Sequence, residues 1–390
     1  MQKNYKMSMR LKTVAKLSVF ISVLLFCVAV GFYAFTRLEL TERNREVNLY
    51  SLVPKDCVGV LESNHLSSFM NELPSLNYHK ELTAFQFPGL FEFLLHHFNE
   101  YAVNNAHGLS SQMNHLMVSF HHPNSVRDQV VYFRMGDSDR QLLEDMMQEY
   151  APINFLPKEE KYRGKTIVVY PLGQDEFLAT YWESGFMVLS FQKRLIEQVI
   201  DAKSDKSSLN EEPVFSQILS QKKSQSNLTL YTRSTSMPFM KLDSLCWSEY
   251  DFYMNSDVLY LTGSTYQQNS NITLADMMGG MVEDTFLNEE GIYVSANRDS
   301  TVQFIGQNYD QSEKTPYPLF SHCVSNLSQE AAFTLVTDME KVVETPNRFI
   351  HYLPSFILEN ARVLRSFILS AQLSFNQGCP SHVWVLTYKN

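Results

Sequence analysis

The pattern of hydrophobic and polar residues changes sharply along this chain. Residues 17–35, LSVFISVLLFCVAVGFYAF, form a run of 19 residues without a charge, enough for a helix to cross a hydrocarbon core about 30 Å thick. Only basic charges precede this run, whereas charges of both signs follow it. The positive-inside rule therefore predicts a cytoplasmic tail at 1–16, a transmembrane signal anchor at 17–35 and the remaining chain across the membrane. A cleaved signal peptide ending near Gly31 is the alternative.

Beyond a polar stalk at 36–49, short apolar runs alternate with turn residues, which is the pattern of strands joined in hairpins. The predicted hairpins are 115–121 with 129–135, 177–182 with 186–191, 250–254 with 258–263, 291–296 with 302–306, and 367–375 with 383–388. Further strands are predicted at 57–62, 166–170, 227–231 and 331–336. Apolar residues at helical spacing predict helices at 90–103, 137–151, 192–202 and 347–365, and a short one from Pro213.

A polar and charged stretch from Ser204 to Glu212 interrupts this pattern. We therefore predict an α+β fold of two lobes, each an antiparallel sheet with packed helices, preceded by one N-terminal transmembrane helix. The first lobe covers 50–205 and the second 225–390, with a linker and short helix at 206–224 between them.

Charge and cysteine content narrow the classes of partner. The chain carries 42 acidic against 32 basic residues, a formal charge of −10, and part of the basic minority lies in the N-terminal tail. Such an acidic body excludes nucleic-acid binding through neutralisation of phosphates. Four cysteines lie beyond the apolar run, and their spacing leaves both disulfides and buried thiols open; they are Cys57, Cys246, Cys323 and Cys379.

Histidine is the one residue type whose distribution suggests chemistry. Most of the histidines fall between His65 and His122. His115 and His121 lie on one face of a predicted strand, and a helix carrying His97 could supply a third metal ligand. The alternative is that these are polar strand ends and exposed helix positions. Nucleophile and phosphate-binding motifs are absent from the sequence, so we predict no catalytic residue and no cofactor.

Several short motifs carry a family resemblance. They are Leu52-Val53-Pro54 with Asp56, Tyr162-Arg163-Gly164-Lys165, the run 186–200 and Pro213-Val214-Phe215 before a strand. Over residues 50–390 the chain resembles the Bacteroidetes envelope proteins grouped as domain of unknown function 3352. The resemblance implies a single-pass or lipid-anchored extracytoplasmic protein, here in the cytoplasmic (inner) membrane with most of the chain in the periplasm. It brings no catalytic residues.

The functional prediction is a membrane-anchored, non-catalytic interaction module of the cell envelope, held to the membrane by 17–35 and bound to an envelope protein. The predicted contact surface is an apolar helical layer around Phe87, Phe91 and Phe93. Two alternatives stay open. One is a metal-dependent envelope enzyme that uses the histidine cluster, and the other is a binder of a small hydrophobic or lipid ligand.

Overall fold

The computed structural model of the chain describes residues 47–83, 115–135 without 124 and 126, 156–173, 176–222, 226–242, 245–268, 273, 278, 280, 291–297, 302–304, 318–376 without 329, and 379–389. The predicted helices 90–103 and 137–151 and the apolar run 17–35 lie outside the described residues.

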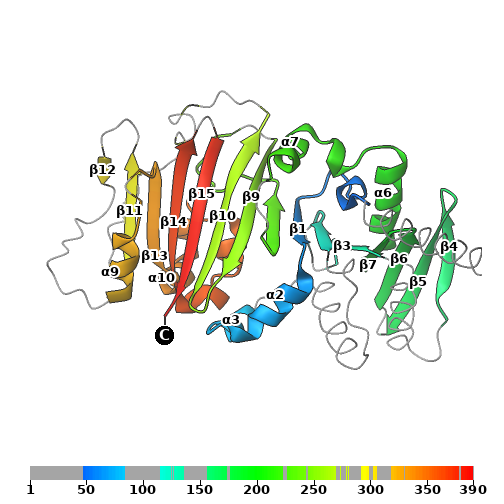
Figure 1. The fold of residues 1–390 in the computed structure, drawn as a ribbon, viewed down its shortest axis with the longest axis horizontal. Helices are drawn as coiled ribbons and strands as arrows, with labels where there is room; N and C mark the ends of the chain where they lie inside the picture. Colours follow the sequence, from blue (N-terminus) through cyan, green and yellow to red (C-terminus); the bar gives the residue numbers. More distant parts are fainter. Residues whose placement is uncertain are drawn as a thin grey trace, which may run out of the picture.

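Within the described residues, one antiparallel sheet of 15 strands runs through the molecule (Figure 1). Its order is β12–β11–β13–β14–β15–β10–β9–β8–β1–β2–β3–β7–β6–β5–β4. The strands of the first half are β1 Gly59–Ser63, β2 Leu116–Phe120, β3 Gln129–Arg134, β4 Lys158–Tyr162, β5 Lys165–Gly173, β6 Glu176–Glu183 and β7 Phe186–Ser190. Those of the second half are β8 Leu228–Thr232, β9 Cys246–Met254, β10 Val258–Gln267, β11 Ile292–Asn297, β12 Val302–Phe304, β13 Phe333–Asp338, β14 Phe367–Asn376 and β15 Cys379–Tyr388.

The two halves repeat one topology. In the first, β1, β2 and β3 form a meander, the chain moves to the outer edge, and β4 to β7 return inward until β7 pairs with β3. In the second, β8, β9 and β10 form the meander, and β13, β14 and β15 return inward until β15 pairs with β10. The halves meet where β1 pairs antiparallel with β8, with Leu61 opposite Leu230. Two antiparallel neighbours such as β1 and β8 are related by a twofold rotation about an axis perpendicular to the sheet. This rotation exchanges the two halves without exchanging the two faces of the sheet, so equivalent strands have the same face on the same side.

Helices cover the two faces of the sheet unequally. One face, here called the α6 face, carries α6 Lys193–Ser204 and α7 Pro213–Gln221 at the first half and α9 Pro318–Ser325 at the far end. The opposite face carries α2 Leu66–Glu72 under the first half and a group of short helices under the second. The remaining short helices are η1 Leu49–Ser51, η2 Leu73–Ser75, α3 His79–Thr83, η3 Leu209–Glu211, α10 Met339–Glu344, α11 Pro346–Phe349, α12 Ser355–Glu359 and η5 Val363–Ser366.

The predicted fold class is wrong in its main features. The chain forms one continuous sheet rather than two lobes of sheet with packed helices, because β1 and β8, far apart in sequence, pair along five residues of each strand. The segment 206–224 contributes Phe215 of α7 to the core, where its ring packs on Tyr231 and Trp247. Strand dominates the described residues, so the α+β description does not hold either.

The predicted transmembrane helix is likewise not borne out. Of the helices in the described part of the chain, none is both long and apolar enough to cross a membrane.

Local predictions fare better than the global one. Each predicted hairpin appears as a pair of neighbouring strands, and the helix predicted at 192–202 is α6. The single helix predicted at 347–365 is wrong, because Pro354 lacks an N–H donor and the chain instead forms α11, α12 and η5 in succession. Strand β4 was not predicted, since its charged sequence KEEKY lacks apolar alternation.

A close approach of strands occurs at Gly263 of β10. The imidazole Nε2 of His382 on β15 reaches across this glycine and donates to the carbonyl oxygen of Glu249 on β9, 3.0 Å away. Burial lowers the pKa of His382 to about 3, so the ring is neutral. A Cβ at Gly263 would overlap the Glu249 carbonyl. Glycine is therefore required where the three strands meet.

We expect Gly263→Ala to destabilise the protein by about 3 kcal/mol, because the backbone of β9 would have to move away from β10. The midpoint of urea unfolding measures this loss. Ser264→Ala is the matched control on the next residue, since it removes only a hydroxyl that contacts Ser381 at 3.2 Å. Equal midpoints for the two variants would contradict the close approach.

Candidate functional site

One part of the α6 face is not covered by any helix of the described residues. Between α7 and α9, the outward side chains of β10 and β15 alternate regularly with buried ones and are partly or fully exposed. No helix is drawn across this stretch of strands in Figure 1. Val383 is 39% exposed and Tyr253, at the border on β9, is 44% exposed. We call this surface the open face; it consists of Tyr253, Val258, Tyr260, Thr262, Ser264, Ser381, Val383 and Val385.

The open face has no charged side chain, although the chain as a whole is acidic. Cross-strand partners build it: Tyr260 lies opposite both Tyr253 and Val385, and Thr262 lies opposite Val383. Tyrosine with depleted charge is the composition found at the centre of protein interfaces. The two sides of the open face are bordered by α7, packed near Trp247, and by α9, whose Cys323 Sγ lies 3.7 Å from Thr387 Oγ1.

A single row of cross-strand partners connects the open face with a buried charge cluster. From Val383 the row continues through Thr262, Asp251 and Thr229 to Glu62 on β1. Along this row the side chains change from exposed and uncharged to buried and charged. The centre of the sheet is therefore polar beneath α7, where the two halves join.

Glu62 lies at the centre of this cluster, and both of its carboxylate oxygens accept hydrogen bonds. Its Oε1 accepts a hydrogen bond from His115 Nε2 at 2.9 Å, and its Oε2 accepts from the Tyr50 hydroxyl at 2.7 Å and from Lys222 Nζ at 2.8 Å. Lys222 also donates to the Tyr231 hydroxyl at 2.6 Å. Burial alone would raise the pKa of Glu62, but the bonds from His115 and Lys222 and their charges lower it to about 2.

Glu249, on β9, has the opposite environment. The residue is 7% exposed, and its Oε1 has no hydrogen-bond partner among the described residues. Burial, together with the charge of Asp251 and against the attraction of Lys222, raises the pKa of Glu249 to about 7. Asp251 itself is well bonded, since its Oδ1 accepts from Ser226 at 2.8 Å and from Thr229 at 2.7 Å. One lysine thus faces several buried acids.

The chemistry of this cluster is that of a structural hydrogen-bond network and not of a reaction centre. Its bonds join η1, β1, β8 and β9 with the residue before β2 and the residue after α7, and the carboxylates are directed to protein partners. Two acids with pKa values moved in opposite directions do occur at catalytic sites, but they also arise in structural ion-pair networks. In the described part of the chain, no group of three or more His, Cys, Asp or Glu side chains could hold a metal ion.

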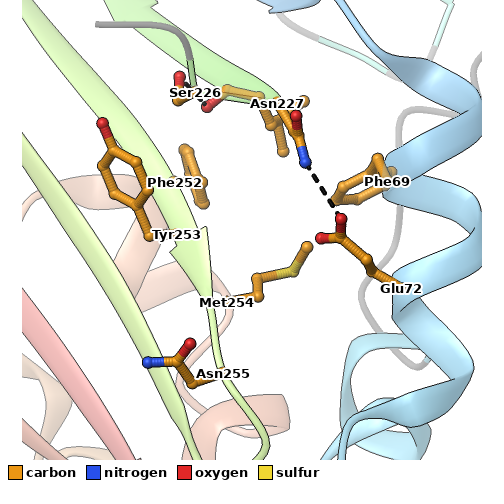
Figure 2. A pocket seen from close by; sticks show the side chains of 9 residues that line it. Phe69, Glu72, Ser226, Asn227, Phe252, Tyr253, Met254 and Asn255 are labelled. Atoms are coloured by element: carbon orange, nitrogen blue, oxygen red, sulfur yellow. Dashed lines mark hydrogen bonds between the residues drawn. The ribbon is translucent and has the colours of Figure 1, made fainter.

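A small cavity lies on the other side of the sheet, where α2 meets the ends of β8 and β9 (Figure 2). Its volume is about 220 Å³. Figure 2 shows Phe69 and Met254 from opposite walls, with Glu72 joined to Asn227 by a hydrogen bond of 3.4 Å across the rim. Ligand sites are usually about 300–1,000 Å³, so this cavity suits only a small molecule.

The predicted metal ligands are not brought together. His115 precedes β2 and bonds Glu62, whereas His121 follows β2, is 3% exposed and bonds Ser119 at 2.8 Å. Six residues of extended chain separate them by about 20 Å, too far to share one ion, although both lie on the same strand face. The third candidate, His97, lies outside the described residues.

The predicted contact residues Phe87, Phe91 and Phe93 also lie outside the described residues, so that surface stays a prediction. Sequence reasoning missed the open face. A signal was present, because the runs 258–264 (VLYLTGS) and 381–385 (SHVWV) contain no Asp, Glu, Lys or Arg in an otherwise acidic chain. It could not show which of the two faces of these strands a helix would cover.

Comparisons with known proteins add no relative. Neither a protein-family model, nor a curated protein, nor a solved structure matches this chain. The resemblance to the Bacteroidetes envelope family therefore stays a prediction.

Proposed function

We propose that this protein is a non-catalytic interaction module that binds a protein partner through the open face. The observation that supports the proposal is a partly exposed, uncharged and tyrosine-containing surface on the sheet between α7 and α9. Exposed apolar side chains that share one surface, here Tyr253 and Val383, are a feature of interaction sites.

The edges of the sheet are poorer candidates for a partner. Strand β4 exposes charged residues, among them Lys158, Glu159 and Lys161, and β12 has only three residues. Charges and short length are the features by which proteins prevent strand addition at sheet edges. A partner is therefore expected on the face of the sheet, where side chains supply the contacts.

A photo-crosslinking amino acid at position 383 tests the proposal in cells that express the full chain. We expect a discrete protein adduct from this position and none from position 350, because Ile350 is 47% exposed but lies outside the open face. Thr262→Glu in the same chain should remove the adduct, since a charge would be buried without a partner. An absence of protein adducts from position 383, or equal adducts from both positions, would refute the proposed function.

A second candidate function is the binding of a small hydrophobic ligand in the cavity beside α2, favoured by its apolar wall of Phe69, Phe252 and Met254. Under this alternative, Met254→Trp would fill the cavity and abolish ligand binding while leaving crosslinks from position 383 unchanged.

A further inference from the structure

The open face has a covered counterpart in the other half of the sheet. By the repeated topology, β10 and β15 correspond to β3 and β7, because each pair joins the third strand of a meander to the last returning strand. On β3 and β7 the same face is occupied by α6. Val188 of β7 and Tyr132 of β3 are fully buried beneath that helix, whereas Val383 of β15 is exposed.

The dimensions of the open face fit one helix. Two neighbouring strands are about 10 Å wide, which is the diameter of an α-helix with its side chains. From Val258 to Ser264 the strand is about 20 Å long, and α6, with 12 residues, is about 18 Å long. α7 and α9 border this strip, so a helix laid in it would lie between two existing helices.

We propose that the open face binds an amphipathic α-helix of a partner protein, in the place that α6 occupies in the other half. This inference rests on the proposed function and names the chemistry of its partner. The bound helix must present an apolar, uncharged stripe, because Thr262, Val383 and the neighbouring side chains offer no ion-pair partner. In α6 the corresponding stripe is Leu195, Ile196, Val199 and Ile200.

The chain itself supplies the probe. A fluorescent peptide of residues 192–204, stapled between positions 197 and 201 to hold it helical, is titrated into the purified full-length protein. We expect saturable binding in the micromolar range, weakened about tenfold or more by Val383→Glu, because the added charge would be desolvated without a partner. Ile350→Glu is the matched control and should bind like the wild type, since Ile350 is exposed elsewhere.

A second variant and a second peptide exclude unfolding of the protein and non-specific peptide binding as causes of the result. Thr262→Glu, on the strand next to Val383, should weaken binding as Val383→Glu does, and both variants should unfold at the wild-type temperature. A peptide whose four stripe residues are replaced by serine should not bind.

Three results would contradict the proposal that the partner is a helix. They are no saturation by the stapled peptide, equal affinity for Val383→Glu, or a wild-type dimer that Val383→Glu dissociates, which would make the occupant a second copy of this chain. If the peptide fails while the crosslinks from position 383 still yield a protein adduct, the partner is not a helix and the proposed function survives. If both fail, the open face is not an interaction site.

Discussion

Lys222→Met should lower the free energy of unfolding at pH 7 by about 3–4 kcal/mol, the largest loss expected from any single substitution considered for this protein. The ammonium group of Lys222 is 2.8 Å from Glu62 Oε2 and 2.6 Å from the Tyr231 hydroxyl. The side chains of Lys222 and Glu62 are only 15% and 5% exposed. Without the lysine, buried carboxylates lose their shared cation, and the desolvation of these charges is no longer offset.

Urea unfolding at pH 7 measures this loss, and Lys193→Met is the matched control. Lys193 pairs with Glu160 at 2.6 Å but is 41% exposed, so solvent screens the pair and its removal should cost far less than that of Lys222. The double variant Lys222→Met with Glu62→Leu should recover part of the stability, because no charge is then left unpaired at that point. Equal losses for the two lysine variants would show that the cluster is effectively solvated.

Glu249→Gln should stabilise the protein by about 2–3 kcal/mol above pH 7. The pKa of Glu249 is raised from 4.5 to about 7 in the folded state, so the folded protein holds this proton more tightly than the unfolded chain does. The resulting stabilisation is fully present below pH 4.5 and is lost as the pH rises to about 7. At higher pH the wild type must keep an ionised carboxylate buried, whereas the amide carries no charge.

Thermal unfolding of both proteins from pH 4 to pH 8 checks this expectation. The stability difference should grow between pH 4.5 and 7 and then remain constant. Glu344→Gln is the control, because Glu344 is 58% exposed and pairs with Lys341 at 3.5 Å. For Glu62, whose pKa is lowered to about 2, the pH dependence of stability has the opposite sign. Its contribution to the free energy of unfolding is present above pH 4.5 and is lost as the pH falls towards 2. A stability difference for Glu249→Gln that is independent of pH would contradict the assignment.

Histidine illustrates how a correct local rule led to a wrong site. Side chains six residues apart on a strand do share a face, as predicted for His115 and His121. The rise of the strand nevertheless places them at opposite ends of β2, where one joins the Glu62 network and the other bonds Ser119. Shared orientation is a property of the sequence period, whereas proximity requires neighbouring strands in register.

The buried acids were invisible for a similar reason. Glu249 and Asp251 stand in the strand CWSEYDFYM, where alternating acidic residues indicate a solvated face. The pairing of β9 with β8 instead places them beneath α7, beside Lys222, and only this long-range contact makes them buried. Their unusual protonation follows from the tertiary environment and not from the strand.

The sequence by itself determined the hairpins, because alternation and turn residues act between neighbours along the chain, as in β2 with β3 and β14 with β15. It also determined α6, whose apolar stripe is contained within 12 residues. Only the tertiary structure decided that both halves share one sheet, since the pairing of Leu61 with Leu230 joins residues with no local relation. It likewise decided which face stays open, because helix coverage of a strand depends on elements distant in the chain.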